Sequence, residues 1–385
     1  MLAVSCHVGA LKVLCGAVVL VLACTDAVQP GDSDDPLLPP ASRVVAVAAG
    51  FSSSCALTQT GRMYCWGENR FGELGDSSRT VRPAPVPVQS ESTFTFLAGT
   101  QGTSRTCAIT RSGAAYCWGY NLNGEVGDGS VTDRWVPTLV SGGISFANIS
   151  TSYHTCGVDR GGASYCWGPD LSGALGRGSP PYGDITRPGR VATTTRFTVV
   201  TTGLQFSCAL DAFGHAYCWG WAAMAGAGGR LDTVYNVPVA VQTALRFVSL
   251  SAAEDHTCGV TSDGAAYCWG GVDGVFGDIV NTPRRIPAIP KVRQVVGGRL
   301  SSCVLTTEGR ALCAARGDTL QMVADSIRFA GLSVGSGHAC GFTQGGAVYC
   351  WGEYWSAGQL GDGTLQRPPT PLTAVRVVFP RLPPG

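Results

Sequence analysis

Seven pairs of cysteines, each with its two members ten residues apart, constrain the fold of this chain more than any other feature. A glycine follows the first cysteine of every pair by six positions, which gives the unit C-x5-G-x3-C. A motif that recurs in register along 385 residues indicates a repeat array and not a set of unrelated domains. The pairs are Cys55/Cys65, Cys107/Cys117, Cys156/Cys166, Cys208/Cys218, Cys258/Cys268, Cys303/Cys313 and Cys340/Cys350.

The glycine of each unit predicts a tight β-hairpin. A three-residue loop that ends in a left-handed glycine is a common hairpin connection, because only glycine accepts a positive φ at little cost. With residues 59–61 as the loop, Ala56 lies opposite Tyr64 and Cys55 opposite Cys65. Opposed strand residues have Cα atoms about 4.5–5.5 Å apart, so we expect seven cross-strand disulfides. Zinc ligation is the alternative, but cysteines that bind zinc usually have only about two to four residues between them.

The positions around the cysteines are also regular. A small residue follows the first cysteine and a tyrosine precedes the second, except in unit six, which pairs Val304 with Leu312. Trp-Gly follows the second cysteine except at Ala314. The repeated tryptophans could bind sugars, but their fixed position favours a core between strands or blades. They are Trp66, Trp118, Trp167, Trp219, Trp269 and Trp351.

The repeat length predicts the architecture. Successive first cysteines are 52, 49, 52, 50, 45 and 37 residues apart, and each period holds four short β-rich runs. The last run contains proline, as in residues 134–139, which is typical of an edge strand. We therefore predict an all-β fold, a seven-bladed β-propeller of four-stranded repeats over residues 43–385. A β-solenoid is the alternative, although its coils are usually shorter. Unit six is the shortest and is expected to leave a notch beside it.

Three motifs resemble the regulator of chromosome condensation repeat family, in a secreted bacterial form. They are Gly-x-x-x-x-Cys-Ala-(Leu/Ile), Tyr-Cys-Trp-Gly, and the Asn69-x-x-Gly-x-Leu-Gly-Asp76 loop, which is copied at residues 121–128. The resemblance covers about residues 43–379. It implies a seven-bladed ring that closes by pairing strands from both chain ends. Residues 44–47 and 375–378 both fit that closing strand, and the sequence does not choose between them.

The resemblance implies two kinds of function, and they do not agree equally well with the sequence of this chain. The eukaryotic founder of the family exchanges guanine nucleotide on a small GTPase and docks on chromatin. This chain has seven expected disulfides, which persist only in oxidising compartments, and no matched motif for the exchange surface. Exchange activity therefore remains an alternative by family analogy alone. Secreted members of the fold include an inhibitor of β-lactamases, and a secreted binding role fits this chain better.

The N-terminus is expected to direct export. Residues 13–23 are an apolar run after Lys12, too short to span a bilayer, and residues 21–24 resemble a bacterial lipobox. We predict a signal peptide over residues 1–23, then a lipidated Cys24 and a flexible tether to residue 42. The lipid would be the only contact with a membrane. An ordinary signal peptide that is cut nearby is the alternative.

The charged residues suggest neither a nucleic-acid partner nor a metal. Charged residues make up 14%, the net charge is +1, and no Lys/Arg run occurs, so phosphate neutralisation has little support. His154, His256 and His338 each precede a first cysteine by two positions. They either form a metal site near the axis or bond the backbone of their own blades, and we prefer the second. The Asp-Gly loops at Asp76, Asp128, Asp278 and Asp362 are read as tight turns and not as calcium sites.

No cofactor, metal or catalytic residue is predicted, and two functions remain. The first is a monomeric extracytoplasmic scaffold, lipid-anchored in the cell envelope or secreted, that binds an unknown protein or glycan. The second is an extracellular carbohydrate-active lyase or hydrolase, which would need paired carboxylates in one pocket. Aromatic and large apolar residues at positions that do not repeat are the expected binding residues. They are Tyr182, Trp221, Met224, Tyr354 and Trp355.

Overall fold

The computed structural model describes residues 43–98, 103–178, 185–227, 230, 232–271, 280–287, 289–299, 301–315, 319–352, 357–366 and 370–380. The expected signal peptide, Cys24 and the tether to residue 42 lie outside these ranges, as do Tyr182, Tyr354, Trp355 and the side chain of Met224. Within these ranges, no helix has both the length and the apolar character needed to cross a membrane.

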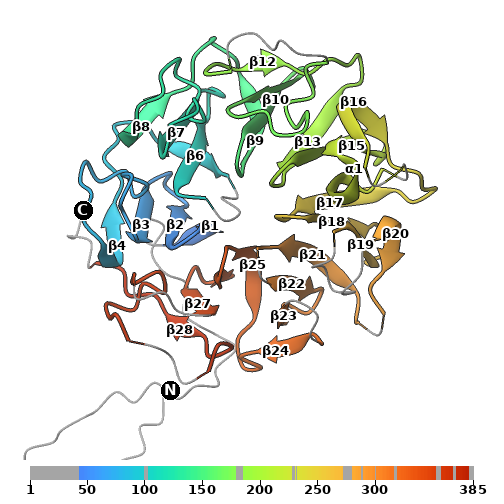
Figure 1. Ribbon diagram of the computed structural model, residues 1–385. Coiled ribbons are helices and arrows are strands. Elements are labelled where there is room, and N and C mark those ends of the chain that lie inside the picture. Colours follow the sequence, from blue (N-terminus) through green and yellow to red (C-terminus); the bar gives the residue numbers. More distant parts are fainter. Residues whose placement is uncertain are drawn as a thin grey trace, which may run out of the picture.

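Seven four-stranded antiparallel sheets stand as blades around a central axis (Figure 1), which confirms the predicted propeller. Blade 1 contains β1 (Val44–Ala49), β2 (Ser53–Thr58), β3 (Met63–Gly67) and β4 (Arg82–Pro87). Blade 2 contains β5 (Phe94–Leu97), β6 (Arg105–Thr110), β7 (Ala115–Gly119) and β8 (Arg134–Leu139). Blade 3 contains β9 (Phe146–Thr151), β10 (Thr155–Asp159), β11 (Ser164–Trp167) and β12 (Gly189–Arg190).

The remaining blades repeat this order. Blade 4 contains β13 (Phe197–Thr202), β14 (Phe206–Asp211), β15 (Ala216–Trp221), the helical turn α1 (Ala222–Ala225) and β16 (Val234–Ala240). Blade 5 contains β17 (Phe247–Ala252), β18 (His256–Thr261), β19 (Ala266–Gly270) and β20 (Val280–Arg285). Blade 6 contains β21 (Val292–Gly297), β22 (Ser301–Thr306), β23 (Ala311–Ala315) and β24 (Gln321–Val323). Blade 7 contains β25 (Phe329–Val334), β26 (His338–Thr343), β27 (Val348–Gly352) and β28 (Val375–Arg376).

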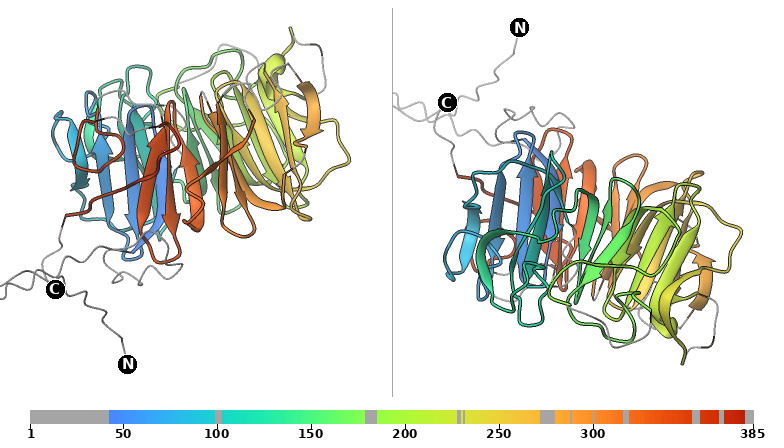
Figure 2. Two further views of the ribbon diagram at one scale, coloured as in Figure 1. Left: turned by 90° about the horizontal axis from the view of Figure 1, so that it is seen from below. Right: turned by 90° about the horizontal axis from the view of Figure 1, so that it is seen from above.

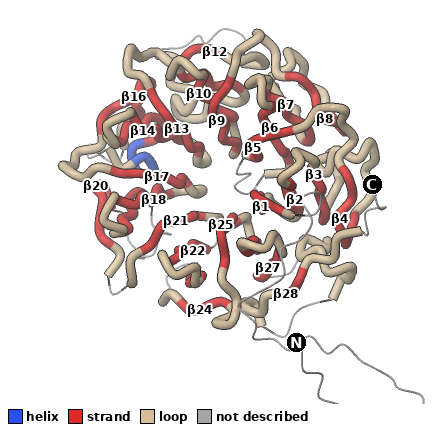
Figure 3. The backbone as a smooth tube through the Cα atoms, turned by 180° about the vertical axis from the view of Figure 1, so that it is seen from behind, coloured by secondary structure: helices blue, strands red, loops and turns tan. Residues whose placement is uncertain are grey.

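The strands run across the thickness of the ring, between its two faces (Figure 2). In each blade the first strand lies nearest the axis and the fourth forms the outer edge (Figure 1). The proline-bearing run of residues 134–139 is β8, an outermost strand, as its proline predicts. The short helical turn α1 contacts both blade 4 and blade 5 (Figure 3).

All seven expected cysteine pairs form disulfides, each between directly opposed residues of the second and third strands of a blade. No described cysteine is therefore left for the alternative of zinc ligation. The bonds are Cys55–Cys65 in blade 1, Cys107–Cys117 in blade 2, Cys156–Cys166 in blade 3, Cys208–Cys218 in blade 4, Cys258–Cys268 in blade 5, Cys303–Cys313 in blade 6 and Cys340–Cys350 in blade 7.

The paired cysteines lie closer together than the hairpin geometry predicts. Their Cα atoms are 4.0 to 4.1 Å apart, below the expected range of about 4.5–5.5 Å. The N–H of Thr58 donates to the carbonyl of Arg62 at 2.9 Å, so Thr58 and Arg62 form a hydrogen-bonded pair. Pairs alternate along an antiparallel ladder, which makes Cys55 and Cys65 a non-hydrogen-bonded pair, the closer of the two kinds.

The turn of the hairpin requires glycine, as the repeated unit predicts. Gly61 has a φ of 84°, which lies in the left-handed region. A Cβ on Gly61 would lie 2.8 Å from the carbonyl oxygen of Phe94. Glycine is therefore needed at this position both for its conformation and for the close approach of the next blade.

The expected closing strand is wrong. Every described sheet consists of four consecutive strands, so β1 belongs to the first blade and β28 to the last, and neither of these strands pairs into the other's sheet. Blades 1 and 7 meet side to side instead. The N–H of Val44 donates to the carbonyl of Gly346 at 3.3 Å, and the N–H of Ser336 donates to Gly50 at 3.1 Å. The two ends of the repeat array therefore meet at a boundary between two blades and not within one blade.

Removing one disulfide is expected to lower stability without opening the ring. Replacing Cys208 and Cys218 with Ala should lower the free energy of unfolding by about 2–3 kcal/mol, because the bond closes a short loop in the unfolded chain. Chemical denaturation of the oxidised variant against the wild type measures this loss. Removing the Cys258–Cys268 pair is the matched control, since it closes a loop of the same length. Very different losses for the two pairs would contradict a loop-entropy origin.

Candidate functional site

Six buried tryptophans join neighbouring blades. Each is at most 2% exposed, so these indoles form the core between blades and offer no surface to a sugar. In five of them the indole N–H donates to a main-chain carbonyl in a loop of the preceding blade. These bonds run from Trp66 to Gln359 at 2.9 Å, Trp118 to Glu73 at 3.0 Å, Trp167 to Glu125 at 2.9 Å, Trp219 to Ala174 at 2.8 Å and Trp269 to Ala225 at 3.1 Å.

The three repeated histidines also link blades. The Nε2 atom of each lies within hydrogen-bonding distance of a serine hydroxyl in the next blade. The pairs are His154 with Ser207 at 2.6 Å, His256 with Ser302 at 3.1 Å and His338 with Ser54 at 2.7 Å. The expectation that each would bond the backbone of its own blade is therefore wrong. Among the residues that the structure describes, no three His, Cys, Asp or Glu side chains are placed to hold a metal ion.

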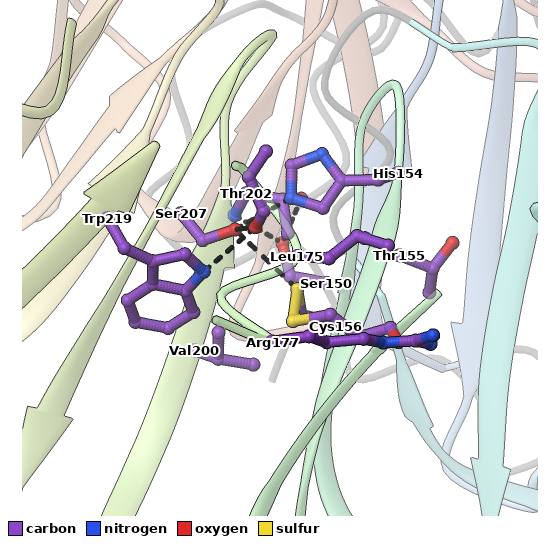
Figure 4. Close-up of a disulfide and its surroundings, with 12 residues drawn as sticks. Ser150, His154, Thr155, Cys156, Leu175, Arg177, Val200, Thr202, Ser207 and Trp219 are labelled. Carbon is purple, nitrogen blue, oxygen red and sulfur yellow. Dashed lines mark hydrogen bonds between the residues drawn. A yellow bond between two sulfur atoms is a disulfide. The ribbon is translucent and has the colours of Figure 1, made fainter. Parts of the chain in front are cut away.

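The contact between blades 3 and 4 illustrates the hydrogen bonds of the histidine and the tryptophan (Figure 4). Ser207 donates to the carbonyl of Ala174 at 3.0 Å, the same oxygen that accepts the Trp219 N–H. A hydroxyl has one proton, so Ser207 must accept from Nε2 of His154. The Nδ1 atom of His154 has no partner among the described residues, and burial, with the charge of Arg105, lowers the pKa of this histidine to about 3. His154 is therefore a neutral structural donor at pH 7.

The loops that connect the third and fourth strands of the blades all lie on one face of the ring. This follows from the meander, because the third strands all run in the same direction across the ring. We call this the loop face. The cysteine hairpins lie on the opposite face, which we call the hairpin face. The Asn69–Asp76 and 121–128 loops are therefore on the loop face of blades 1 and 2.

A group of exposed and half-buried aromatic and arginine side chains lies on the loop face of these two blades, with Phe71 and Tyr120 half-buried. The rings of Phe71 and Tyr120 meet edge to face with centroids 5.1 Å apart. Arg70 lies 5.4 Å from the centroid of Phe71, and Arg79 lies 5.5 Å from that of Trp135, which is 45% exposed. Trp, Tyr and Arg are the residues that most often dominate protein–protein binding energy. We call these five residues the loop-face cluster.

The cluster is held by close contact between the two blades. A Cβ on Gly72 would lie 2.6 Å from Cδ1 of Trp135, so only glycine lets this ring approach. The N–H of Ser77 donates to the carbonyl of Trp135 at 3.1 Å. Arg79 donates through Nε to the carbonyl of Arg70 at 2.8 Å. The sequence analysis missed these residues, although Trp135 stands outside the repeated tryptophan position and could have indicated them.

A buried carboxyl group supports the loop in each of blades 1 and 2. Glu73 accepts the N–H of Phe71 at 2.7 Å, and burial raises the pKa of Glu73 to about 7. Glu125 occupies the same position in blade 2 and lies 3.7 Å from the guanidinium of Arg105. Ser53 occupies the position of Arg105 in blade 1, so Glu73 lacks that counter-charge. The two carboxyls order their loops and do not form a pair.

The Asp-Gly loops use their carboxylates within the turn. Asp76 accepts from the amide of Asn69 at 3.0 Å, from the hydroxyl of Ser78 at 2.7 Å and from Nε of Arg82 at 3.0 Å. Burial alone would raise the pKa of Asp76, but the bonds from Ser78 and Arg82 bring it below its usual value. Asp128 likewise accepts from the hydroxyl of Ser130 and from Nε of Arg134, Asp362 accepts from Thr364, and Asp278 lies outside the described residues.

The five expected binding residues are only partly placed. Trp221 is half-buried at the end of β15 on the loop face, where its main-chain N–H donates to the carbonyl of Gln205 at 3.0 Å. Met224 is in α1, on the same face, and its side chain lies outside the description. Tyr182, Tyr354 and Trp355 fall in segments that the structure does not describe. Of the five, only Trp221 has a described side chain, so the binding set stays a prediction.

Comparisons with known proteins point to one family. The model described as "Regulator of chromosome condensation (RCC1) repeat" matches residues 44–73, 100–125 and 247–277, and a second model of that description matches residues 60–109. The ultraviolet-B receptor UVR8 of Arabidopsis thaliana is 34% identical over 113 residues, which are 28% of this chain and 26% of that protein. The aligned segments span only 2% to 26% of the lengths of the curated relatives.

Solved structures share the fold. Human WBSCR16 superposes with a TM-score of 0.73 and 18% identity, covering 83% of this chain and 94% of that one. Prp20p from Saccharomyces cerevisiae superposes with a TM-score of 0.69 and 19% identity, covering 88% of each chain. At such low identity these two similarities show the fold alone.

Proposed function

The chain belongs to the regulator of chromosome condensation (RCC1) repeat family, and from this premise we propose that it is a scaffold that binds a protein partner outside the cytoplasm. The observation that carries the proposal is the loop-face cluster, in which the exposed Trp135 and two exposed arginines surround two half-buried aromatic rings. Prp20p, which has the same fold, is described as binding Gsp1p and histones. Protein binding is therefore a role that this fold supports.

The compartment follows from the disulfides. Seven cross-strand disulfides indicate an oxidising environment, since cytosolic thiols are kept reduced. Within that environment we place the protein in the cell envelope, as a monomer held by a lipid on Cys24. A protein partner is favoured over a glycan because the cluster combines aromatic rings with two arginines, the composition typical of protein interfaces.

Substitution within the cluster tests the proposal. The exported protein, with its disulfides intact, serves as bait for proteins of the envelope and culture medium of its source. Trp135→Ala is expected to weaken retention of the specific partner by about 10-fold or more, the usual cost of losing an interface anchor. Phe213→Ala is the matched control, because Phe213 is 77% exposed in the hairpin between β14 and β15, on the hairpin face. Equal retention by wild type and Trp135→Ala would place binding elsewhere.

A further inference from the structure

A cavity of about 480 Å³ lies between blades 6 and 7. Its volume is within the range of ligand sites in proteins, about 300–1,000 Å³. It is the notch that the short sixth unit predicts, and both blades contribute to its walls. Its lining includes Cys303, Cys313, Gln321, His338, Ala339 and Trp351.

At five other interfaces, those for which the structure describes the loop, the corresponding space is filled by the chain itself. A Gly-x-(Leu/Val)-Gly segment of one blade lies against the indole of the next, at residues 72–75, 124–127, 173–176 and 358–361. Its apolar side chain is fully buried, as Leu74 is. The main-chain carbonyl of its second residue accepts the indole N–H of the next blade, as Glu73 does for Trp118. Between blades 4 and 5 the carbonyl comes from Ala225 in α1. A last glycine such as Gly75 lies directly against the ring of Trp118.

In blade 6 the connection between the third and fourth strands is too short to contain this segment. In blade 1 the strand β3 ends at Gly67 and β4 begins at Arg82, whereas in blade 6 the strand β23 ends at Ala315 and β24 begins at Gln321. The connection is too short to hold a loop of the same kind. The indole of the following blade, Trp351, is nevertheless retained, and it packs in one cluster with the Cys303–Cys313 disulfide.

Two polar groups at this cavity are left without partners. Trp351 is 2% exposed, in the register of the other tryptophans, and its N–H has no acceptor among the residues that the structure describes. His338 is 1% exposed, and its Nδ1 atom is also unpartnered. The second donor to the loop carbonyl, Ser54 or Thr106 in other blades, is replaced here by Ala339. The Trp351 N–H lines the cavity without a protein partner, so an incoming acceptor would give it the hydrogen bond that the other tryptophans make.

We propose that this cavity receives an extended peptide segment of the partner protein, in which a Leu or Val side chain is followed by glycine. The segment takes the place of the missing loop: its main-chain carbonyl accepts the Trp351 N–H, and its apolar side chain packs against the Cys303–Cys313 disulfide. Gln321 lines the cavity and supplies an amide for the remaining peptide groups. This inference rests on the proposed function, since it names the chemistry of part of the partner.

The chain's own loop provides the probe. A synthetic peptide with the sequence of residues 69–76 is titrated into the full-length protein while the indole N–H signals are followed by NMR, and Trp351→Phe identifies the signal of Trp351. We expect a saturable shift of that signal. A peptide with aspartate in place of its leucine should bind at least about 10-fold more weakly. Ala339→Ser restores the second donor and should tighten binding about 5-fold.

Two controls make the outcome decisive. Trp66→Phe should leave peptide binding unchanged, because the space beside Trp66 is filled by the loop that contains Gln359. Isoamyl alcohol carries the same branched side chain and no peptide group, and an equal affinity for it would overturn the proposal in favour of a small apolar ligand. No shift of the Trp351 signal would also overturn it. If the bait still retains its partner through Trp135 in that case, the proposed function stands and only this cavity assignment fails.

Discussion

His338→Gln is expected to abolish a loss of about 3 kcal/mol in the free energy of unfolding, which the wild type undergoes between pH 7 and pH 4. Burial lowers the pKa of His338 to about 4 and, with the charge of Arg105, lowers that of His154 to about 3, whereas the unfolded value is 6.5. Both folded values are depressed, so the unfolded state binds protons first. The stability that these histidines contribute is therefore complete above about pH 6.5 and is lost as the pH falls. His154→Gln should remove a similar loss.

The measurement is the free energy of unfolding of the oxidised protein across this pH range, as a difference between wild type and variant. The difference is needed because Glu73 acts in the opposite direction. Its pKa is raised from 4.5 to about 7, so the folded state gains stability as that carboxyl is protonated. Wild type and His338→Gln should differ little at pH 7, because glutamine can still donate to Ser54. Parallel curves down to pH 4 would contradict the assignment of buried neutral histidines.

Features formed by residues close together in the sequence were predicted well, and contacts between residues far apart in the sequence were not. The Cys55–Cys65 disulfide follows from a hairpin of eleven residues, whose turn glycine fixes the register. The partner of His154 could not be found in this way, because Ser207 lies 53 residues away in the next blade. The ring closure failed for a related reason. Valine-rich runs at both ends fit an inner or outer strand equally, and only packing decides where each blade begins.

The candidate site was predicted less well than the fold. Phe71, Tyr120 and Trp135 belong to different strands or loops, and their exposure depends on how two blades meet. Trp221 was predicted as a binding residue from its unusual position; it is half-buried on the loop face, and its role stays a prediction. The notch beside unit six was predictable from length alone, because a period of 37 residues leaves too little chain for the usual loop. The unpaired Trp351 N–H inside it required the structure.

Trp66→Ala is expected to lower the free energy of unfolding by about 3–5 kcal/mol, the usual loss for a large buried aromatic side chain. The substitution removes a fully buried indole and its bond to Gln359, which is 293 residues away. Trp219→Ala is the matched control, because Trp219 is equally buried and bonds Ala174 in the same way. Chemical denaturation should give losses of similar size for the two variants.

The two variants should differ in where the ring opens. Blades 3 and 4 are joined by the chain, so Trp219→Ala removes a contact between covalently connected neighbours. Blades 1 and 7 are joined by packing and hydrogen bonds but not by a connecting segment of chain, and no described sheet contains strands from both ends. Hydrogen exchange should therefore quicken in β1, β2 and β26 of Trp66→Ala and remain slow in the same strands of Trp219→Ala. Equal exchange in the two variants would mean that the closing interface is no weaker than the covalently joined ones.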